Sequence, residues 1–151
     1  MAYAEKTEVP IEKSIAEIVA LVKKAGAERV AQYEEPERFT IQFQMHGRMV
    51  RFRVQLQPLS VVPNRAGNGP WRTDQQRKKV LDQMHRQRAR ALLLVIKAKL
   101  ESIESEVETF EEAFLANVVL SNGQTVFERI GEPLALEYAT GQRAILLEGP
   151  R

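Results

Sequence analysis

Two neighbouring stretches of the chain alternate apolar and polar residues along almost their whole length, and this pattern limits the possible folds more than any other feature. Residues 38–46 read RFTIQFQMH, and residues 47–57 read GRMVRFRVQLQ. A period of two residues places alternate side chains on opposite faces of an extended strand, so one face of each stretch is apolar. The two stretches predict a β-hairpin. Gly47-Arg48 suits its turn because glycine is preferred first in a type II′ turn.

The position of that turn predicts the pairing of the two strands. Met45 would lie opposite Val50, and each further apolar residue would again meet an apolar one. The other face would carry arginine and glutamine side chains and no acidic residue. A face of this composition is either solvated, covered by a helix, or in contact with a polyanion.

Helices are expected on both sides of the hairpin in the sequence. Apolar residues recur at helical spacing from Pro10, which suits the first helical position, to Gly26, which can end the helix. Residues 27–34 predict a further strand. The sequence TDQQ at Thr73 is a capping box, and we expect a long helix from there to about Val107.

Two more capping boxes predict short helices after Thr109 and Thr125. Gly131 and Pro133 are expected to interrupt or restart the second of these helices, and Gly141 is expected to end it. The C-terminal third is therefore predicted to be helical.

The order of these elements predicts the α+β class. We expect a three-stranded antiparallel sheet packed on an N-terminal helix and a long central helix, followed by short C-terminal helices. The 151 residues are sufficient for a single domain with its own core. We divide it into an α-β-β-β part at residues 1–57, a flexible loop at 58–72, a helical part at 73–141 and a tail at 142–151.

Features of secreted and membrane proteins are missing from the sequence. There is no cysteine, and the N-terminal residues lack the apolar segment of a signal peptide. The longest apolar run, ALLLVI at residues 91–96, is far shorter than a membrane span. We therefore expect a cytoplasmic protein with no membrane partner.

Charge is distributed very unevenly, although the net charge of the chain is only +2. Residues 47–99 hold 13 basic and 2 acidic side chains, a net charge of +11, and residues 100–151 hold 3 basic and 10 acidic ones, a net charge of −7. Asymmetry of this size indicates contact with nucleic acid or another polyanion. The alternative is that the acidic C-terminal helices fold across the basic segment and neutralise it.

A stacking platform for bases is predicted around Trp71, the only tryptophan. It lies in the proline- and glycine-rich loop between Arg65 and Arg72, and exposed aromatic rings among arginines are the usual platform for unpaired bases. The alternative is that Trp71 folds back and covers the core. Lys78 and Lys79 follow in the first turns of the long helix, where positive charge opposes the helix dipole unless an anion binds there.

The candidate nucleic-acid-binding residues are therefore polar and basic side chains of the hairpin, the loop and the first half of the long helix, together with the tryptophan. They are Gln42, Gln44, Arg48, Arg51, Arg53, Arg65, Trp71, Arg72, Arg77, Lys78, Lys79, Arg86, Arg88 and Arg90.

Catalytic, metal and cofactor sites are not indicated. His46 and His85 are far apart in the sequence and have no cysteine or acidic residue at ligand spacing. No phosphate-binding or nucleophile motif occurs. We therefore expect no catalytic residues, no metal ligands and no cofactor. A metal-dependent nuclease that uses the glutamates between residues 101 and 112 is kept as a third possibility.

Four stretches, GAERV, GRMVRFR, RQRARALLLVIKAKLESIE and TFEEAFLANVVLSNGQTV, together resemble a family of small proteins encoded by tailed bacteriophages and prophages. The resemblance spans most of the chain, and the last two stretches are its most specific part. It carries no activity over to this chain, and it implies a phage origin and the cytoplasm of a bacterial host. Separately, the expected order of elements is similar to that of the double-stranded-RNA-binding domain, whose glycine and histidine signatures are missing here.

Together these features favour a non-enzymatic nucleic-acid-binding protein that acts in phage replication or recombination, with single-stranded DNA or RNA as its expected partner. The alternative from another class is a protein-interaction factor, either an inhibitor of a host enzyme or an accessory protein, that uses the acidic C-terminal helices. The apolar belt at residues 91–96 is also consistent with a homo-oligomer.

Overall fold

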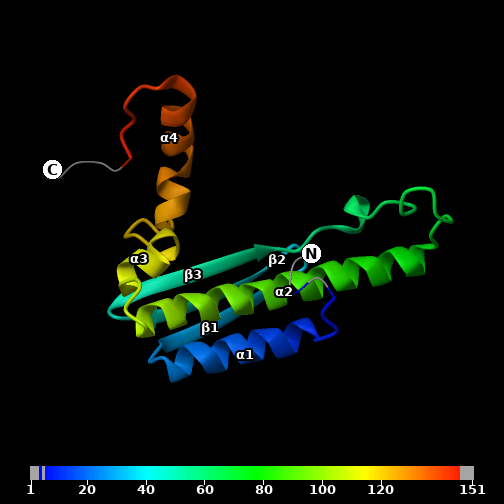
Figure 1. Ribbon diagram of the computed structural model, residues 1–151, viewed down its shortest axis with the longest axis horizontal. Helices are drawn as coiled ribbons and strands as arrows, with labels where there is room; N and C mark the ends of the chain where they lie inside the picture. Colours follow the sequence, from blue (N-terminus) through cyan, green and yellow to red (C-terminus); the bar gives the residue numbers. More distant parts are fainter. Residues whose placement is uncertain (1–3, 5, 147–151) are drawn as a thin grey trace.

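The structure, a computed structural model, describes residue 4 and residues 6–146, so residues 147–151 of the expected tail lie outside it. The chain is α+β, as predicted, with a sheet backed by two long helices (Figure 1). No helix among the described residues is long and apolar enough to cross a membrane. In order, the elements are α1 (Ile11–Lys24), β1 (Glu28–Glu35), β2 (Arg38–Met45), β3 (Arg48–Gln55), the 3-10 helix η1 (Leu59–Val61), α2 (Asp74–Glu104), α3 (Phe110–Phe114), the 3-10 helix η2 (Leu115–Asn117) and α4 (Val126–Thr140).

The β2–β3 hairpin forms where the alternation predicts it, but its register differs from the prediction by two residues. Met45 lies opposite Arg48 and not opposite Val50, because the turn consists of His46 and Gly47. Both turn residues have positive φ, 51° and 73°, as in a type I′ turn. A shift of two residues keeps every side chain on its predicted face, so alternation alone could not distinguish the two registers.

The core lies between the sheet and the two long helices. α1 and α2 lie side by side across the apolar face of the sheet (Figure 1), as predicted. Burying one large apolar side chain contributes about 1.5–3 kcal/mol, so this layer holds the elements together. Its buried members are Ile15, Ile18, Val22, Phe39, Ile41, Phe43, Met45, Val50, Phe52, Ala89, Leu92, Leu93, Ile96, Phe110, Ala113 and Phe114.

α2 is much longer than the sheet it covers. Its 31 residues span about 46 Å at a rise of about 1.5 Å per residue. The eight residues of β3 span only about 26 Å. The first turns of α2 therefore extend beyond the sheet, and the preceding loop accompanies them (Figure 1). We call this projecting unit, residues 58–81, the tip.

The two parts of the tip are joined by Arg77. Its guanidinium donates hydrogen bonds to the carbonyl oxygens of Leu59, at 3.1 Å, and Val62, at 3.2 Å. Val62 is buried. One side chain from the first turn of α2 thus fixes the course of the loop that precedes the helix.

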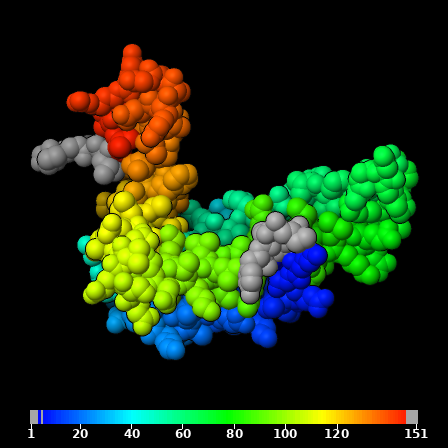
Figure 2. Space-filling view, viewed as in Figure 1, coloured from blue at the N-terminus to red at the C-terminus, as the bar shows by residue number. Residues whose placement is uncertain are grey.

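After α3 the chain passes along the outer edge of β3. Val118 forms an antiparallel bridge with Val50, and the Val119 N–H donates to the carbonyl oxygen of Met49 at 2.8 Å. This short pairing was not predicted from the sequence. It places the start of α4 at the hairpin, and α4 then projects away from the body (Figures 1 and 2).

α4 is one continuous helix of 15 residues, and the predicted interruption at Gly131 and Pro133 does not occur. Proline removes one hydrogen bond from a helix, but the helix continues on both sides of it. It ends at Gly141, whose φ of 69° is left-handed, as predicted. No residue of α4 is buried.

Candidate nucleic-acid interface

The outer face of the hairpin, which points away from α1 and α2, is partly occupied by the chain's own C-terminal segment. Arg51 is buried there. Its guanidinium donates to the carbonyl oxygen of Gly123 at 2.6 Å and to the Glu128 carboxylate at 3.3 Å. The same carboxylate lies 3.5 Å from the Arg53 guanidinium. Arg51 is therefore used to attach α4 to the sheet.

The surroundings of Glu128 shift its acidity. Burial raises the pKa of the carboxyl group, but hydrogen bonds from the Arg51 and Thr125 side chains, together with the charges of Arg51 and Arg53, outweigh that effect. The net shift of the Glu128 pKa is downward. The carboxylate consequently stays ionised and paired at neutral pH.

The other candidate residues of the hairpin lie near its turn. Arg48 forms an ion pair with Glu111 at 3.3 Å. Gln42 and Gln44 are half-buried on the outer face, on the side of the sheet opposite to α2. The acidic C-terminal segment thus neutralises the turn end of the hairpin, and the glutamines are not brought together with the tip.

Two arginines in the middle of α2 connect that helix to the rest of the body. Arg88 donates to the carbonyl oxygen of Gln55 at 2.8 Å. Arg90 forms an ion pair with Glu17 of α1, with 2.6 Å between the nitrogen and the oxygen. Both guanidinium groups therefore serve the packing of α2 on its neighbours.

Arg72 within the tip and Arg86 close to it also bind partners within the chain. Arg86 donates to Gln83 at 2.7 Å, and Arg72 donates to the carbonyl oxygen of Pro63 at 3.0 Å. With Arg77, these residues shape the tip and its junction with the body.

Trp71 is exposed at the tip and does not cover the core. The exposed fraction of its side chain is 68%, and the guanidinium carbon of Arg65 lies 4.8 Å from its ring centroid. This is a cation–π arrangement. Beside the ring is a hollow of about 350 Å³, which is lined by Ala66, Gly69, Pro70, Trp71, Arg72, Gln76 and Val80.

Lys78 and Lys79 are the cations of the tip that remain free within residues 6–146. Both are exposed, and no hydrogen bond or ion pair joins either side chain to another residue that the structure describes. Asp74, the one acid of residues 58–81, lies 3.8 Å from Arg77. The acidic helices lie at the opposite end of the molecule (Figure 1) and leave this part of the basic segment uncovered.

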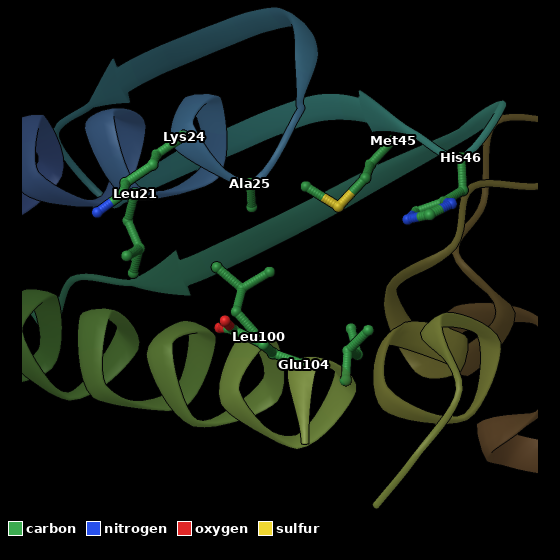
Figure 3. Close-up of a pocket in the computed structure, with 8 residues that line it drawn as sticks. Leu21, Lys24, Ala25, Met45, His46, Leu100 and Glu104 are labelled. Atoms are coloured by element: carbon green, nitrogen blue, oxygen red, sulfur yellow. The ribbon is translucent and has the colours of Figure 1, made fainter. Parts of the chain in front are cut away.

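A second hollow, which the sequence did not suggest, opens where α1 and α2 end beside the hairpin turn (Figure 3). Its volume is about 430 Å³, and Leu21, Met45 and Leu100 form much of its apolar wall, with His46 and Glu104 on its border. These residues come from three distant parts of the chain, so no local motif could have indicated the hollow.

Both histidines make contacts inside the molecule. The His85 Nε2 atom lies 2.9 Å from the carbonyl oxygen of Gln57, and the His46 ring lies 4.8 Å from the Phe110 ring. Within the part of the chain that the structure describes, no group of three or more His, Cys, Asp or Glu side chains is placed to hold a metal ion.

No protein-family model, curated protein or solved structure matches the chain. Among the predicted residues, those that remain most open to a ligand lie together at the tip. They are Arg65, Trp71, Lys78 and Lys79.

Proposed function

We propose that the protein is a non-enzymatic nucleic-acid-binding protein that takes single strands at the tip and acts in phage replication or recombination. The observation that carries the proposal is the exposed ring of Trp71 in the same projecting unit as Lys78 and Lys79. Most of the other predicted arginines instead bind carbonyl oxygens or carboxylates of the chain itself.

Stacking on Trp71 favours unpaired bases. A base stacked on an aromatic side chain gains about 1–3 kcal/mol, and only a base outside a duplex can offer its whole face. Arg65 lies over the indole and restricts its orientation. Pro70 and Val80 line the adjoining hollow and offer apolar surface to the edge of such a base.

Lys78 and Lys79 suit the phosphate backbone. Residues 58–81 hold five basic side chains and one acidic one, and the first turn of a helix adds a partial positive charge of about +0.5. A phosphate would relieve the repulsion among these charges. Each neutralised phosphate releases counterions, so the logarithm of affinity should fall with the logarithm of salt by about 0.7 per phosphate on a single strand.

Trp71 also supplies the test, because it is the only tryptophan and its fluorescence reports on the tip alone. The protein is titrated with an unlabelled thymidine oligonucleotide at low salt. We expect the single strand to quench the Trp71 fluorescence to saturation, and the quenching to decrease as the salt concentration rises. A duplex of equal length should quench the fluorescence less. Unchanged fluorescence, together with no binding of a labelled strand at low salt, would exclude the proposal.

A further inference from the structure

α4 carries an apolar surface that the described residues of its own chain leave largely uncovered, with only Ile130 half-buried. Phe127, Ile130, Leu134 and Tyr138 follow one another at spacings of three and four residues and so share one side of the helix. The exposed fractions are 64% for Phe127, 39% for Leu134 and 85% for Tyr138. We call these four residues the α4 stripe.

A helix of this kind is not expected to be stable alone. Isolated helices shorter than about 12–15 residues are marginal in water. α4 has 15 residues, and Gly131 and Pro133 weaken it. The projecting position of α4 (Figure 2) leaves the stripe accessible to another molecule. Burial of the stripe would supply the stability that the sequence of the helix lacks.

The charges of α4 restrict what can cover the stripe. The helix holds three glutamates and one arginine, and Glu128 is already paired with Arg51 and Arg53. Glu132 and Glu137 of α4 form no ion pair with any other residue that the structure describes. Two α4 helices packed together would bring the same negative charges close, which opposes that pairing. A suitable cover is apolar in its centre and positive at its rim.

The tip has both properties. Trp71, Pro70 and Val80 line its hollow, and Arg72 lines it as well. The Arg65 guanidinium lies over the Trp71 ring, and Lys78 and Lys79 add two exposed positive charges on the same unit. The tip and α4 lie at opposite ends of the molecule (Figure 1), so α4 cannot reach the tip of its own chain.

We infer that the α4 stripe of one copy docks on the tip of a second copy, head to tail. Such a contact joins two different surfaces, so it leaves one stripe and one tip free and allows further copies to add. The docking would use the same tip as nucleic acid. The α4 helix of one copy and a nucleic-acid single strand would therefore compete for the same tip. This part of the inference rests on the proposed function.

Sedimentation of the full chain at low salt tests the docking with three variants. Tyr138→Ser removes the most exposed side chain of the stripe. Trp71→Ala with Lys78→Gln and Lys79→Gln removes the aromatic ring and two of the five basic side chains of the tip. Val107→Ser, at a residue that is 75% exposed and outside both surfaces, is the matched control. Circular dichroism establishes that each variant keeps its helices.

We expect the wild type and the control to associate with rising concentration and to dissociate in high salt. Each of the other two variants should sediment as a monomer of 17.2 kDa. An equimolar mixture of the stripe variant and the tip variant retains one intact pair of surfaces, so it should form dimers that do not grow further. This outcome is specific to a contact between unlike surfaces.

Three results would overturn the inference. They are a wild type that stays monomeric at low salt, a tip variant that associates as the wild type does, and a mixture of the two variants that stays monomeric. The second result would also point to pairing of like surfaces through α4. The stripe variant keeps the whole tip, so its oligonucleotide binding tests the proposed function separately from the docking.

Discussion

Ser14 lies on the inner side of α1, is fully buried, and has a hydroxyl without a hydrogen-bond partner among the described residues. An unpaired buried polar group costs about 1–3 kcal/mol, and alanine is a better helix former than serine by about 0.5 kcal/mol. We predict that Ser14→Ala raises the free energy of unfolding by about 1 kcal/mol, measured by urea denaturation. Ser102→Ala is the control and should lower it, because the Ser102 hydroxyl donates to Glu108 at 2.8 Å. A less stable Ser14→Ala protein would contradict the prediction.

Replacement of Trp71 distinguishes two roles of its ring, which are stacking against a nucleic-acid base and packing within the protein. Because the ring is 68% exposed, Trp71→Ala should change the free energy of unfolding by less than about 0.5 kcal/mol. It should weaken single-strand binding by about 1–3 kcal/mol and leave the salt dependence nearly unchanged. Anisotropy of a labelled oligonucleotide at several salt concentrations measures both quantities. If the variant instead has a much lower free energy of unfolding while its folded molecules bind the single strand as tightly as wild type, Trp71 serves packing and not stacking.

At the scale of elements, the start of α4 departs from the capping box that its sequence predicts. The Thr125 hydroxyl accepts from the Glu128 N–H at 3.1 Å, which is one half of the box. Glu128 does not return a bond to the backbone of Thr125, because its carboxylate is turned to Arg51 and Arg53. The residue that would have completed a local cap instead fixes the helix to the sheet.

The ion pair of Glu128 should make stability depend on pH. The folded-state pKa of Glu128 lies below the ordinary value of 4.5, so the contribution of the pair is complete above that value. It is lost as the pH falls through the lowered pKa. We predict that Glu128→Gln lowers the free energy of unfolding at pH 7 by about 1–2 kcal/mol, and that the difference from wild type shrinks below about pH 4.5.

Urea denaturation across this pH range measures the effect. Glu132→Gln on the same helix is the control. Glu132 forms no ion pair with any residue the structure describes, so this variant should differ little from wild type at any pH. Equal pH profiles for the two variants would count against the role of the pair.

The two lysine pairs at helix ends offer a second comparison between elements. Lys78 and Lys79 lie near the start of α2, and Lys23 and Lys24 lie in the last turn of α1. A positive charge is unfavourable at a helix start and favourable at a helix end by about 0.3–1 kcal/mol. Replacing Lys78 and Lys79 by glutamine should therefore raise the melting temperature, and the same change at Lys23 and Lys24 should lower it.

Nucleic-acid binding should respond to only one of these lysine pairs. Loss of Lys78 and Lys79 should reduce the salt slope of single-strand binding by about 0.7 for each phosphate that these lysines neutralise. Loss of Lys23 and Lys24 should leave the slope unchanged. If the two double variants show the same salt dependence of single-strand affinity, Lys78 and Lys79 do not contact the phosphates of the strand.

For the whole molecule, local patterns predicted the fold well because they were supported by local chemistry. The capping boxes at Thr73 and Thr109 are both formed in full, and alternation assigned the hairpin side chains to their faces. The register was wrong because Gly47 suits either of two adjacent turns, and the two registers bury the same side chains.

The features that could not be predicted depend on contacts between distant residues. Arg51 and Glu128 are 77 positions apart, and no local signal distinguishes an arginine that binds a distant carboxylate from one that is free. The same holds for Arg88 and the carbonyl oxygen of Gln55. The exposure of Trp71 was one of two open alternatives, because a lone tryptophan in a loop suits either position.

The separation of charge between the two ends affects how the molecule would meet a polyanion. Five basic residues and one acid lie at the tip, and nine glutamates and one arginine lie within residues 101–140, with the long helix between them (Figure 1). In the electric field of a nucleic-acid strand this arrangement experiences a torque as well as a force. A molecule that approaches such a strand would therefore rotate so that the tip leads and the acidic end trails. This alignment fades with added salt, because at 0.1 M the screening length of about 10 Å is already far shorter than the roughly 46 Å length of α2.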